Sequence, residues 1–331
     1  MWIALGSVIV PRAMPDGWNE AMLGGALECA WAISDRVLRE RQGRSCIDLP
    51  HHLRWVWDGA ALAGRTVLVR CYHGLGDTLQ FIRFVPHVAA LARAVIVEAQ
   101  GALLPLLRSV CGAAALYPLD TALPPWEVAI ESMELPHALR ITLADLPGAI
   151  PYLVPPPSAS STMPRQVRTG PERMRVGLVW AAGDWRRERS LRPQLLLPLT
   201  RLPIDLVGLQ LGPARRDPAA SSLIGSFVAS ISEAATVAET AALMCDLDLV
   251  VTVDTMVAHL AGALGRPVWT LLDTDADWRW MRRRSDSPWY PTMRLFRQAE
   301  PGVWGPVVEQ LAEALTVAAR RRAERDPLPI R

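Results

Sequence analysis

The sequence contains no lysine, so all 35 basic residues among its 331 residues are arginines. This absence excludes Schiff-base chemistry and lysine nucleophiles. Only five cysteines are present, and no two are spaced Cys-x-x-Cys, which predicts buried free thiols in a reducing compartment. The six histidines show no metal-ligand spacing. We therefore expect neither a metal site nor a cofactor.

Long uncharged hydrophobic runs are also missing. Residues 1–10 are apolar, but they lack the basic region of a signal peptide and are too short to span a bilayer. No later segment offers about 20 uncharged residues in succession. The net charge is only +2, which predicts no binding to nucleic acid. We expect a cytoplasmic protein that contacts a membrane at most peripherally.

The most informative stretch that is present runs from Asp254 to Pro267. It follows an apolar run, residues 247–253, that is typical of a buried parallel strand. A short helix rich in Ala and Leu begins after the polar pair Asp254-Thr255, and Gly265 can end it. Such a junction points free backbone N–H groups and the positive end of a helix dipole at one spot, which favours phosphate. On its own, an ordinary strand–helix–strand unit is the safer interpretation.

A second junction of this kind lies at residues 66–81. Residues 66–71 predict a strand, and Gly74 and Gly76 permit a tight turn close to a ligand. Asp77 or Thr78 is expected to cap the following helix. The stretch lacks the third glycine of a dinucleotide fingerprint and the Gly-Lys-Ser/Thr ending of a P-loop. As a bare pattern it is therefore weak.

Strands alternate with helices on both sides of residues 147–172, a segment rich in Pro, Ser and Thr that reads as a linker. This alternation predicts an α/β protein with two Rossmann-like parallel-sheet domains, whose ligands bind beyond the carboxyl ends of the strands. The expected division is a helical extension (1–56), a first domain (57–160), a linker core (161–172), a second domain (173–298) and a closing helix with a tail (299–331). The expected strands are 66–71, 94–98, 126–130, 175–180, 204–210, 247–253 and 267–272, and the expected helices outside the two junctions are 15–42, 103–110, 236–244 and 307–322.

Several ordered motifs resemble those of a known family. They are Leu62–Thr66, Gly74–Arg83, Val176–Trp180, Arg189–Leu191, Leu209–Pro213, Asp254–Pro267, Asp277–Trp280 and Ser287–Gln298. On these motifs the chain, from about residue 57 to 304, resembles the glycosyltransferase domain often found after tetratricopeptide repeats in bacteria. That domain is similar to glycosyltransferase family 9, the ADP-heptose:lipopolysaccharide heptosyltransferases. The resemblance implies a GT-B fold, with two Rossmann-like domains facing across a cleft.

The resemblance also implies an inverting, metal-independent glycosyltransferase. It would move a heptose-like sugar or a hexose from a nucleotide-diphosphate donor to a cell-envelope glycan or a protein, in the cytoplasm or at the cytoplasmic face of the inner membrane. The chain departs from the family at three places: Tyr72-His73 replaces a frequent Glu-Gln pair, Met256 stands where heptosyltransferases usually have Gly, and Arg189 is the counterpart of a donor-binding Lys. The sequence does not indicate an oligomeric state.

On the acceptor side, the resemblance makes Asp77 the general base, with His73, Gly74 and Gly76 forming the surrounding loop. The structural alternative for Asp77 is a helix N-cap, and the two roles conflict because a helix N-terminus stabilises the carboxylate and weakens it as a base. An ordinary exposed loop histidine is the alternative role of His73.

On the donor side, Arg189 and Ser190 would bind phosphate oxygens, together with the helix N-terminus at Thr255 and Met256. Without the resemblance, a solvated charged loop is the preferred interpretation of residues 186–189. Each of the other donor-side residues has a structural alternative. These residues are Asp254 (a sugar or ribose hydroxyl, or a helix cap), Gln210 (the base or ribose, or the end of a strand) and His259 (the donor or, preferably, the protein core).

Two other functions remain open. A non-catalytic glycan- or nucleotide-binding module that partners an active transferase would keep the same fold. An epimerase would need a set of catalytic carboxylates around the nucleotide sugar, which the sequence does not identify. The aromatic, arginine-bearing segments Asp277–Trp280 and Trp289-Tyr290 could stack on sugars, but a structural role at the domain interface is the favoured one.

Overall fold

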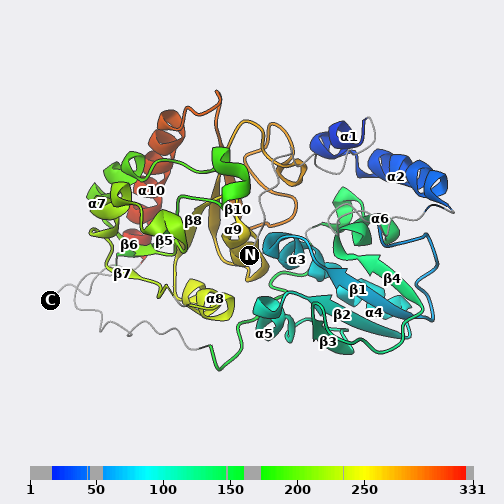
Figure 1. Cartoon of the computed structure of the whole chain (residues 1–331). Coiled ribbons are helices and arrows are strands. Elements are labelled where there is room, and N and C mark those ends of the chain that lie inside the picture. The colour runs from blue at the N-terminus through cyan, green and yellow to red at the C-terminus, as the bar shows by residue number, and fades with distance from the viewer. Residues whose placement is uncertain are drawn as a thin grey trace.

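The computed structural model describes residues 17–42, 44, 55–146, 148–159, 173–233 and 235–325. Within these residues the strands form one sheet of four and one of six, and every pair of named strands is parallel. The two sheets lie side by side, each with helices on its faces (Figure 1). The predicted α/β class with two parallel sheets is confirmed.

The N-terminal sheet has the order β3-β2-β1-β4. Its central strand β1 is an apolar run whose residues Val67, Leu68 and Val69 are fully buried, as expected for a strand covered on both faces. The strands are β1 (Thr66–Cys71), β2 (Ala94–Ala99), β3 (Ala115–Pro118) and β4 (Val128–Glu131), and the helices are α3 (Leu75–Phe81), α4 (Val85–Leu91), α5 (Leu104–Leu107) and α6 (Leu135–Ala138).

The C-terminal sheet has the order β10-β9-β8-β5-β6-β7. Along β8, Val251 and Val253 face a cluster with α10, while Val250 faces the cluster that contains α8 and α9. This alternation covers both faces of the sheet with helices. The strands are β5 (Met174–Val179), β6 (Ile204–Gly208), β7 (Ala229–Ser230), β8 (Leu249–Val253), β9 (Val268–Leu272) and β10 (Met293–Arg297), and the helices are α7 (Ser221–Ile224), α8 (Val237–Cys245), α9 (Met256–Ala263) and α10 (Gly305–Arg325).

The helices α1 (Trp18–Gly24) and α2 (Leu27–Arg41), here called the helical hairpin, contact both halves of the molecule. Glu20 on α1 pairs with Arg282 of the C-terminal half. On α2, the Trp31 indole donates to the carbonyl of Ile141 at 2.7 Å, and Asp35 accepts from Arg140 of the N-terminal half at 2.7 Å. The hairpin therefore ties the two halves together from outside the sheets.

A single hydrophobic cluster also connects the halves, since its buried members run from Trp57 to Leu295 and include residues of both sheets. Arg83, in the 3₁₀ turn Ile82–Phe84 that follows α3, strengthens this contact. Its buried guanidinium donates to the carbonyl of Trp289 at 2.7 Å and to the hydroxyl of Tyr152 at 2.9 Å. The two halves thus share a core rather than meeting only at a surface.

The structure differs from the sequence expectations in several local details. The helix expected at 15–42 is broken at Gly25, whose φ of 78° lies in the left-handed region. The helix expected at 103–110 shortens to α5 after a 3₁₀ turn at residues 101–103. Strands β3, β7 and β10 were not predicted. Residues 148–159 form no helix or strand, and the predicted linker core, 161–172, lies outside the described residues.

The prediction of buried thiols was wrong for three of the four described cysteines. Cys71 is buried in β1, whereas Cys29, Cys111 and Cys245 are exposed, and all four are free. The exposed ones lie on helix or loop surfaces, where sequence polarity gives little warning. Among the described residues, no helix is both long and apolar enough to cross a membrane.

Candidate functional site

The C-terminal sheet reverses its winding between β5 and β8, and parallel sheets bind ligands beyond the carboxyl ends of strands at such a point. Two predicted donor residues meet there. Arg189 lies in the segment after β5, and Asp254 directly follows β8. Their Nη1 and Oδ2 atoms are 3.5 Å apart, and both residues are buried, at 8% and 5% exposure. Arg189 and Asp254, which the sequence analysis both assigned to the donor side, thus lie next to each other at this edge of the sheet.

Burial raises the pKa of the Asp254 carboxyl, and the charge of Arg189 opposes that shift. The helix-capping alternative for Asp254 is wrong, because Thr255 is the N-cap of α9: its hydroxyl accepts from the backbone N–H of Val257 at 3.1 Å. Gly265, with a φ of 66°, follows the end of this helix as predicted. The Asp254 carboxylate therefore pairs with Arg189 and does not cap the helix.

Residues 186–189 form a solvated charged loop only in part, because Arg187 and Glu188 are exposed whereas Arg189 and Arg186 make contacts with the protein. Arg189 is buried, and Arg186 donates to Asp273, the residue that follows β9, at 3.2 Å. Burial raises the pKa of Asp273, and Arg186 counteracts the shift. Ser190 accepts from the backbone N–H of Ala182 at 3.0 Å, so its hydroxyl proton is left to donate to a ligand. Two arginines and two aspartates thus line the carboxyl edge of the sheet.

Gln210 follows strand β6, and its side chain is fully engaged by backbone. Its oxygen accepts from the N–H groups of Trp180 and Ala181 at 3.0 and 2.9 Å. Its nitrogen donates to the carbonyls of Ala181 and Leu211 at 3.3 and 2.9 Å. An amide side chain has no further hydrogen bonds to offer a base or ribose. The structure therefore supports the strand-end role of Gln210 and not the ligand role.

In the N-terminal sheet the winding reverses between β1 and β4. His73, just after β1, places its Nε2 3.9 Å from Oε2 of Glu131, the last residue of β4. Burial, reinforced by neighbouring Glu134, raises the pKa of Glu131 to about 8. Glu131 was not singled out from the sequence, although a carboxylate at the end of a strand beside a glycine-rich turn is a usable signal.

Asp77 lies at the start of α3, but it is not the N-cap. The helix begins at Leu75 with Gly74 as its N-cap, so the predicted cap, Asp77 or Thr78, was three or four residues too late. Asp77 is the third helical residue, and its Oδ2 accepts from the backbone N–H of Gly74 at 2.9 Å. Its other oxygen, Oδ1, accepts from Arg279 of the C-terminal half. Both oxygens of the predicted base are therefore engaged.

Helices α3 and α9 pack closely against each other at Gly76. A Cβ added to Gly76 would lie 2.8 Å from Cδ2 of His259 and 3.6 Å from the Cα of Met256, so only glycine fits. His259 is buried, and its Nδ1 lies 3.0 Å from the Tyr290 hydroxyl. Burial and nearby arginines hold the pKa of His259 well below its usual value. It is a neutral core histidine at the contact between the halves.

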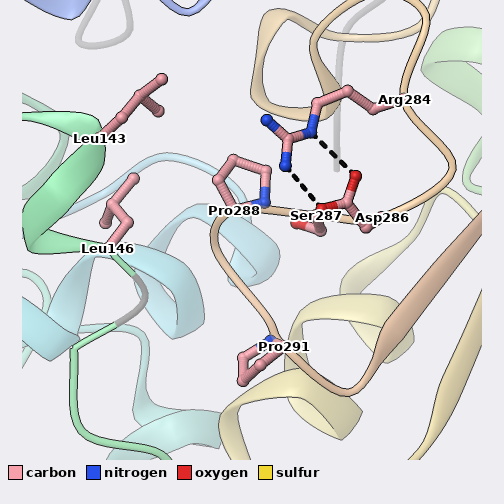
Figure 2. A pocket seen from close by; sticks show the side chains of 7 residues that line it. All are labelled: Leu143, Leu146, Arg284, Asp286, Ser287, Pro288 and Pro291. Carbon is pink, nitrogen blue, oxygen red and sulfur yellow. Dashed lines mark hydrogen bonds and ion pairs between the residues drawn. The ribbon is translucent and has the colours of Figure 1, made fainter.

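A cavity of about 400 Å³ lies away from these residues, between Leu143 and Leu146 on one side and the segment 284–291 on the other (Figure 2). Arg284 and Asp286 pair at its edge, with Nε and Oδ1 3.0 Å apart. None of the predicted site residues lines it. The described residues also contain no group of three or more His, Cys, Asp and Glu side chains that could hold a metal ion.

The raised pKa of Glu131 predicts a pH dependence of stability. Because the native pKa, about 8, exceeds the ordinary value of 4.5, the folded state holds a proton that the unfolded chain releases. The contribution of this proton to the free energy of unfolding is complete below pH 4.5 and is lost as the pH rises toward 8. The melting temperature should fall over that range in the wild type, and less steeply in Glu131→Gln. Thermal melts at pH 5 and pH 8 measure the difference.

A matched control is Glu127→Gln, just before the same strand. Glu127 is exposed, and its hydrogen bond from the backbone of Thr66 lowers its pKa, so it does not titrate between pH 5 and 8. If the melting temperatures of the wild type and of Glu131→Gln fell by the same amount between pH 5 and pH 8, Glu131 would already be ionised at neutral pH.

Residues 227–301, which contain β8, α9, β9 and β10, match the model of glycosyltransferase family 9 (heptosyltransferase). Protein FlbA of Caulobacter vibrioides is 26% identical over an alignment of 296 residues, which covers 78% of this chain and 48% of FlbA. The chain thus spans about half of the length of this curated relative.

Solved structures give a likeness in fold. The E. coli ADP-heptose lps heptosyltransferase II is 16% identical, with a TM-score of 0.53 over 77% of this chain and 99% of that chain. The glycosyl transferase family 9 structure from Veillonella parvula is 11% identical, with a TM-score of 0.49 over 80% of this chain and 97% of that one. The association with tetratricopeptide repeats is not shown. The chain has the GT-B fold of the heptosyltransferase, and its C-terminal half contains a glycosyltransferase family 9-like, heptosyltransferase-like region.

Proposed function

We propose that this protein is an inverting glycosyltransferase that uses a nucleotide-diphosphate sugar and needs no metal. The observation that carries the proposal is the meeting of the two sheet switch points. Arg189, Asp254 and the start of α9 stand on one side, and Asp77 stands on the other, joined to the first side by Arg279. The match of residues 227–301 to the heptosyltransferase family supports this assignment.

The donor's diphosphate would lie at the carboxyl ends of β5 and β8. Arg189 supplies a positive charge there, and α9 points its N-terminal N–H groups at the same edge. Positive groups fixed before the reaction stabilise the charge that develops on the leaving diphosphate, which is the role a metal ion has in other transferases. The donor sugar would be heptose-like or a hexose.

In the reaction, an acceptor hydroxyl oxygen attacks the anomeric carbon from the face opposite the diphosphate. The new carbon–oxygen bond forms as the bond to the phosphate oxygen breaks, and its electron pair leaves with the diphosphate. The hydroxyl proton passes to Asp77. Attack from the opposite face inverts the anomeric configuration. We propose a cell-envelope glycan or a protein as acceptor, and the cytoplasm, or the cytoplasmic face of the inner membrane, as the place of reaction.

A second candidate is a non-catalytic glycan- or nucleotide-binding module that partners an active transferase. The engagement of both Asp77 oxygens, by Gly74 and by Arg279, favours it. A carboxylate that takes the acceptor's proton gives up its ion pair with Arg279. The two candidates therefore differ in whether the Asp77–Arg279 pair opens during a reaction cycle.

The donor assignment predicts nucleoside diphosphate binding without a divalent metal. Isothermal titration calorimetry with ADP, UDP and GDP in EDTA should show binding of at least one of them. The matching monophosphate should bind more weakly, because it lacks the second phosphate that Arg189 would contact. Binding that appears only after Mg²⁺ or Mn²⁺ is added would refute the metal-free donor site.

A further inference from the structure

We propose that Arg279 exchanges partners during the cycle: it pairs with Asp77 before donor binding, and passes to the donor's diphosphate when the nucleotide sugar binds. Donor binding would thereby release Asp77 to act as the base. The inference rests on the proposed function, because it requires a diphosphate at the junction between the halves. It adds Arg279 as a residue that contacts the donor and controls the base.

The position of Arg279 suits this exchange. It lies in the 3₁₀ turn at residues 278–280 of the C-terminal half, and it reaches Asp77, 202 residues earlier, on α3. Its Nη1 is held by Oδ1 of Asp277 at 2.9 Å, and Asp254 is near enough to raise its pKa. The guanidinium thus contacts the predicted base and interacts electrostatically with Asp254.

On one edge of this guanidinium, only one of the two nitrogens has a hydrogen-bond partner. Nε and Nη2 together form a fork that binds two oxygens of a carboxylate or a phosphate. Asp77 takes Nη2 with one oxygen only, since its second oxygen is bonded to the backbone N–H of Gly74. The Nε atom is buried and has no hydrogen-bond partner among the described residues. A buried unpaired donor is costly, so this atom points to a ligand that fills the fork.

The plane of the guanidinium is fixed by aromatic rings. The Phe81 ring centroid lies 5.3 Å from its central carbon, and the Trp278 centroid lies 4.9 Å from it. Arg279 is also 7% exposed, so it is shielded from competing water. A phosphate that offers two oxygens would use both Nε and Nη2, whereas Asp77 uses one. Bidentate binding is the stronger arrangement, which gives the diphosphate its advantage over the carboxylate.

The exchange makes the base depend on the donor. Without a diphosphate, Oδ1 of Asp77 is held in the ion pair with Arg279, so taking the acceptor's proton would break that pair. With a diphosphate bound, that oxygen becomes available while Gly74 still orients the other one. An acceptor is therefore activated only after the donor is in place.

A double-mutant cycle on ADP affinity, repeated with UDP, tests the exchange. Calorimetry in EDTA would compare wild type, Asp77→Asn, Arg279→Gln and the double variant. Asp77→Asn should bind ADP several-fold more tightly, because a neutral amide competes less well for Arg279. Arg279→Gln should bind at least about tenfold more weakly, as for loss of a charge-assisted contact. On the Arg279→Gln background, Asp77→Asn should change the affinity little.

The control is Arg282→Gln, three residues further along the chain, which loses only an exposed pair with Glu20 and should bind ADP like the wild type. If Arg279→Gln unfolds because Asp77 loses its cation, the double variant removes both charges. Comparing the ADP affinity of the double variant with that of Asp77→Asn then gives the effect of Arg279 alone.

Two results would overturn the exchange. Equal tightening by Asp77→Asn on both backgrounds would mean simple repulsion between Asp77 and the nucleotide. Unchanged affinity after removal of Arg279, measured in a folded variant, would mean that Arg279 does not contact the diphosphate. Either result leaves the proposed glycosyltransferase standing. Absence of nucleotide binding in all four proteins, with ADP, UDP and also GDP, would instead remove the donor site and the proposed function with it.

Discussion

Asp77→Asn should lose about 100- to 10,000-fold in turnover while it stays folded and continues to bind donor, because loss of a general base costs that much. Asparagine keeps an oxygen that can accept from the backbone N–H of Gly74, so the start of α3 is preserved. It cannot accept the acceptor's proton. Turnover would be measured as donor consumption and product formation, with thermal melts and calorimetry for fold and binding.

Asp145→Asn is a matched control for this substitution. Asp145 is also the third residue of a short helix, and its carboxylate accepts from the backbone N–H of Thr142 at 2.8 Å. It has the capping role of Asp77 without the proposed chemistry, so Asp145→Asn should leave turnover unchanged. Near-normal turnover in Asp77→Asn would remove Asp77 as the base and favour the non-catalytic module if no other base were found.

Arg189→Ala should slow transfer about 100- to 1,000-fold, the usual effect of losing one preorganised electrostatic donor. It should also destabilise the protein by about 3 kcal/mol, because the buried Asp254 carboxylate loses its partner. The sequence had suggested an exposed arginine with no effect on folding, and burial changes that expectation. Steady-state kinetics and denaturant titrations measure the two effects separately.

The double variant Arg189→Ala/Asp254→Asn separates structure from chemistry. Removing the stranded carboxylate should restore much of the stability and none of the transfer activity. Arg186→Ala provides a comparison within the same segment: Arg186 is 23% exposed and pairs with Asp273, so its loss should cost less stability. Full turnover in Arg189→Ala would reduce this arginine to a structural partner of Asp254.

Sequence reasoning located the strands and helices whose signals are local. The central strands β1, β5 and β8 are mostly apolar because helices cover both of their faces. Helix α9 has a threonine cap and a glycine that follows its end, so its position could be predicted. Strand β7 has only two residues, which is too short for any periodic pattern.

The candidate site was less predictable, because its decisive contacts join distant residues. The Asp77–Arg279 pair spans 202 positions, and nothing near Asp77 in the sequence indicates a cation beside it. The cap of α3 was misplaced because Gly74 has no side chain to signal it, so the first polar residue was chosen instead. The amide of Gln210 looked available to a ligand, since its four bonds go to backbone that only folding brings together.

The helical hairpin has a consequence for folding during synthesis. Glu20 on α1 pairs with Arg282, which is synthesised 262 residues later. The apolar side chains of Trp18 and Met22 pack in one cluster with Met281, the residue just before Arg282. At about 5–20 residues per second, a ribosome needs roughly 10 to 50 seconds to cover that interval. For that time the apolar face of the hairpin lacks its final partners. The nascent chain therefore exposes its earliest described tryptophan to chaperones or aggregation until the C-terminal sheet is nearly complete.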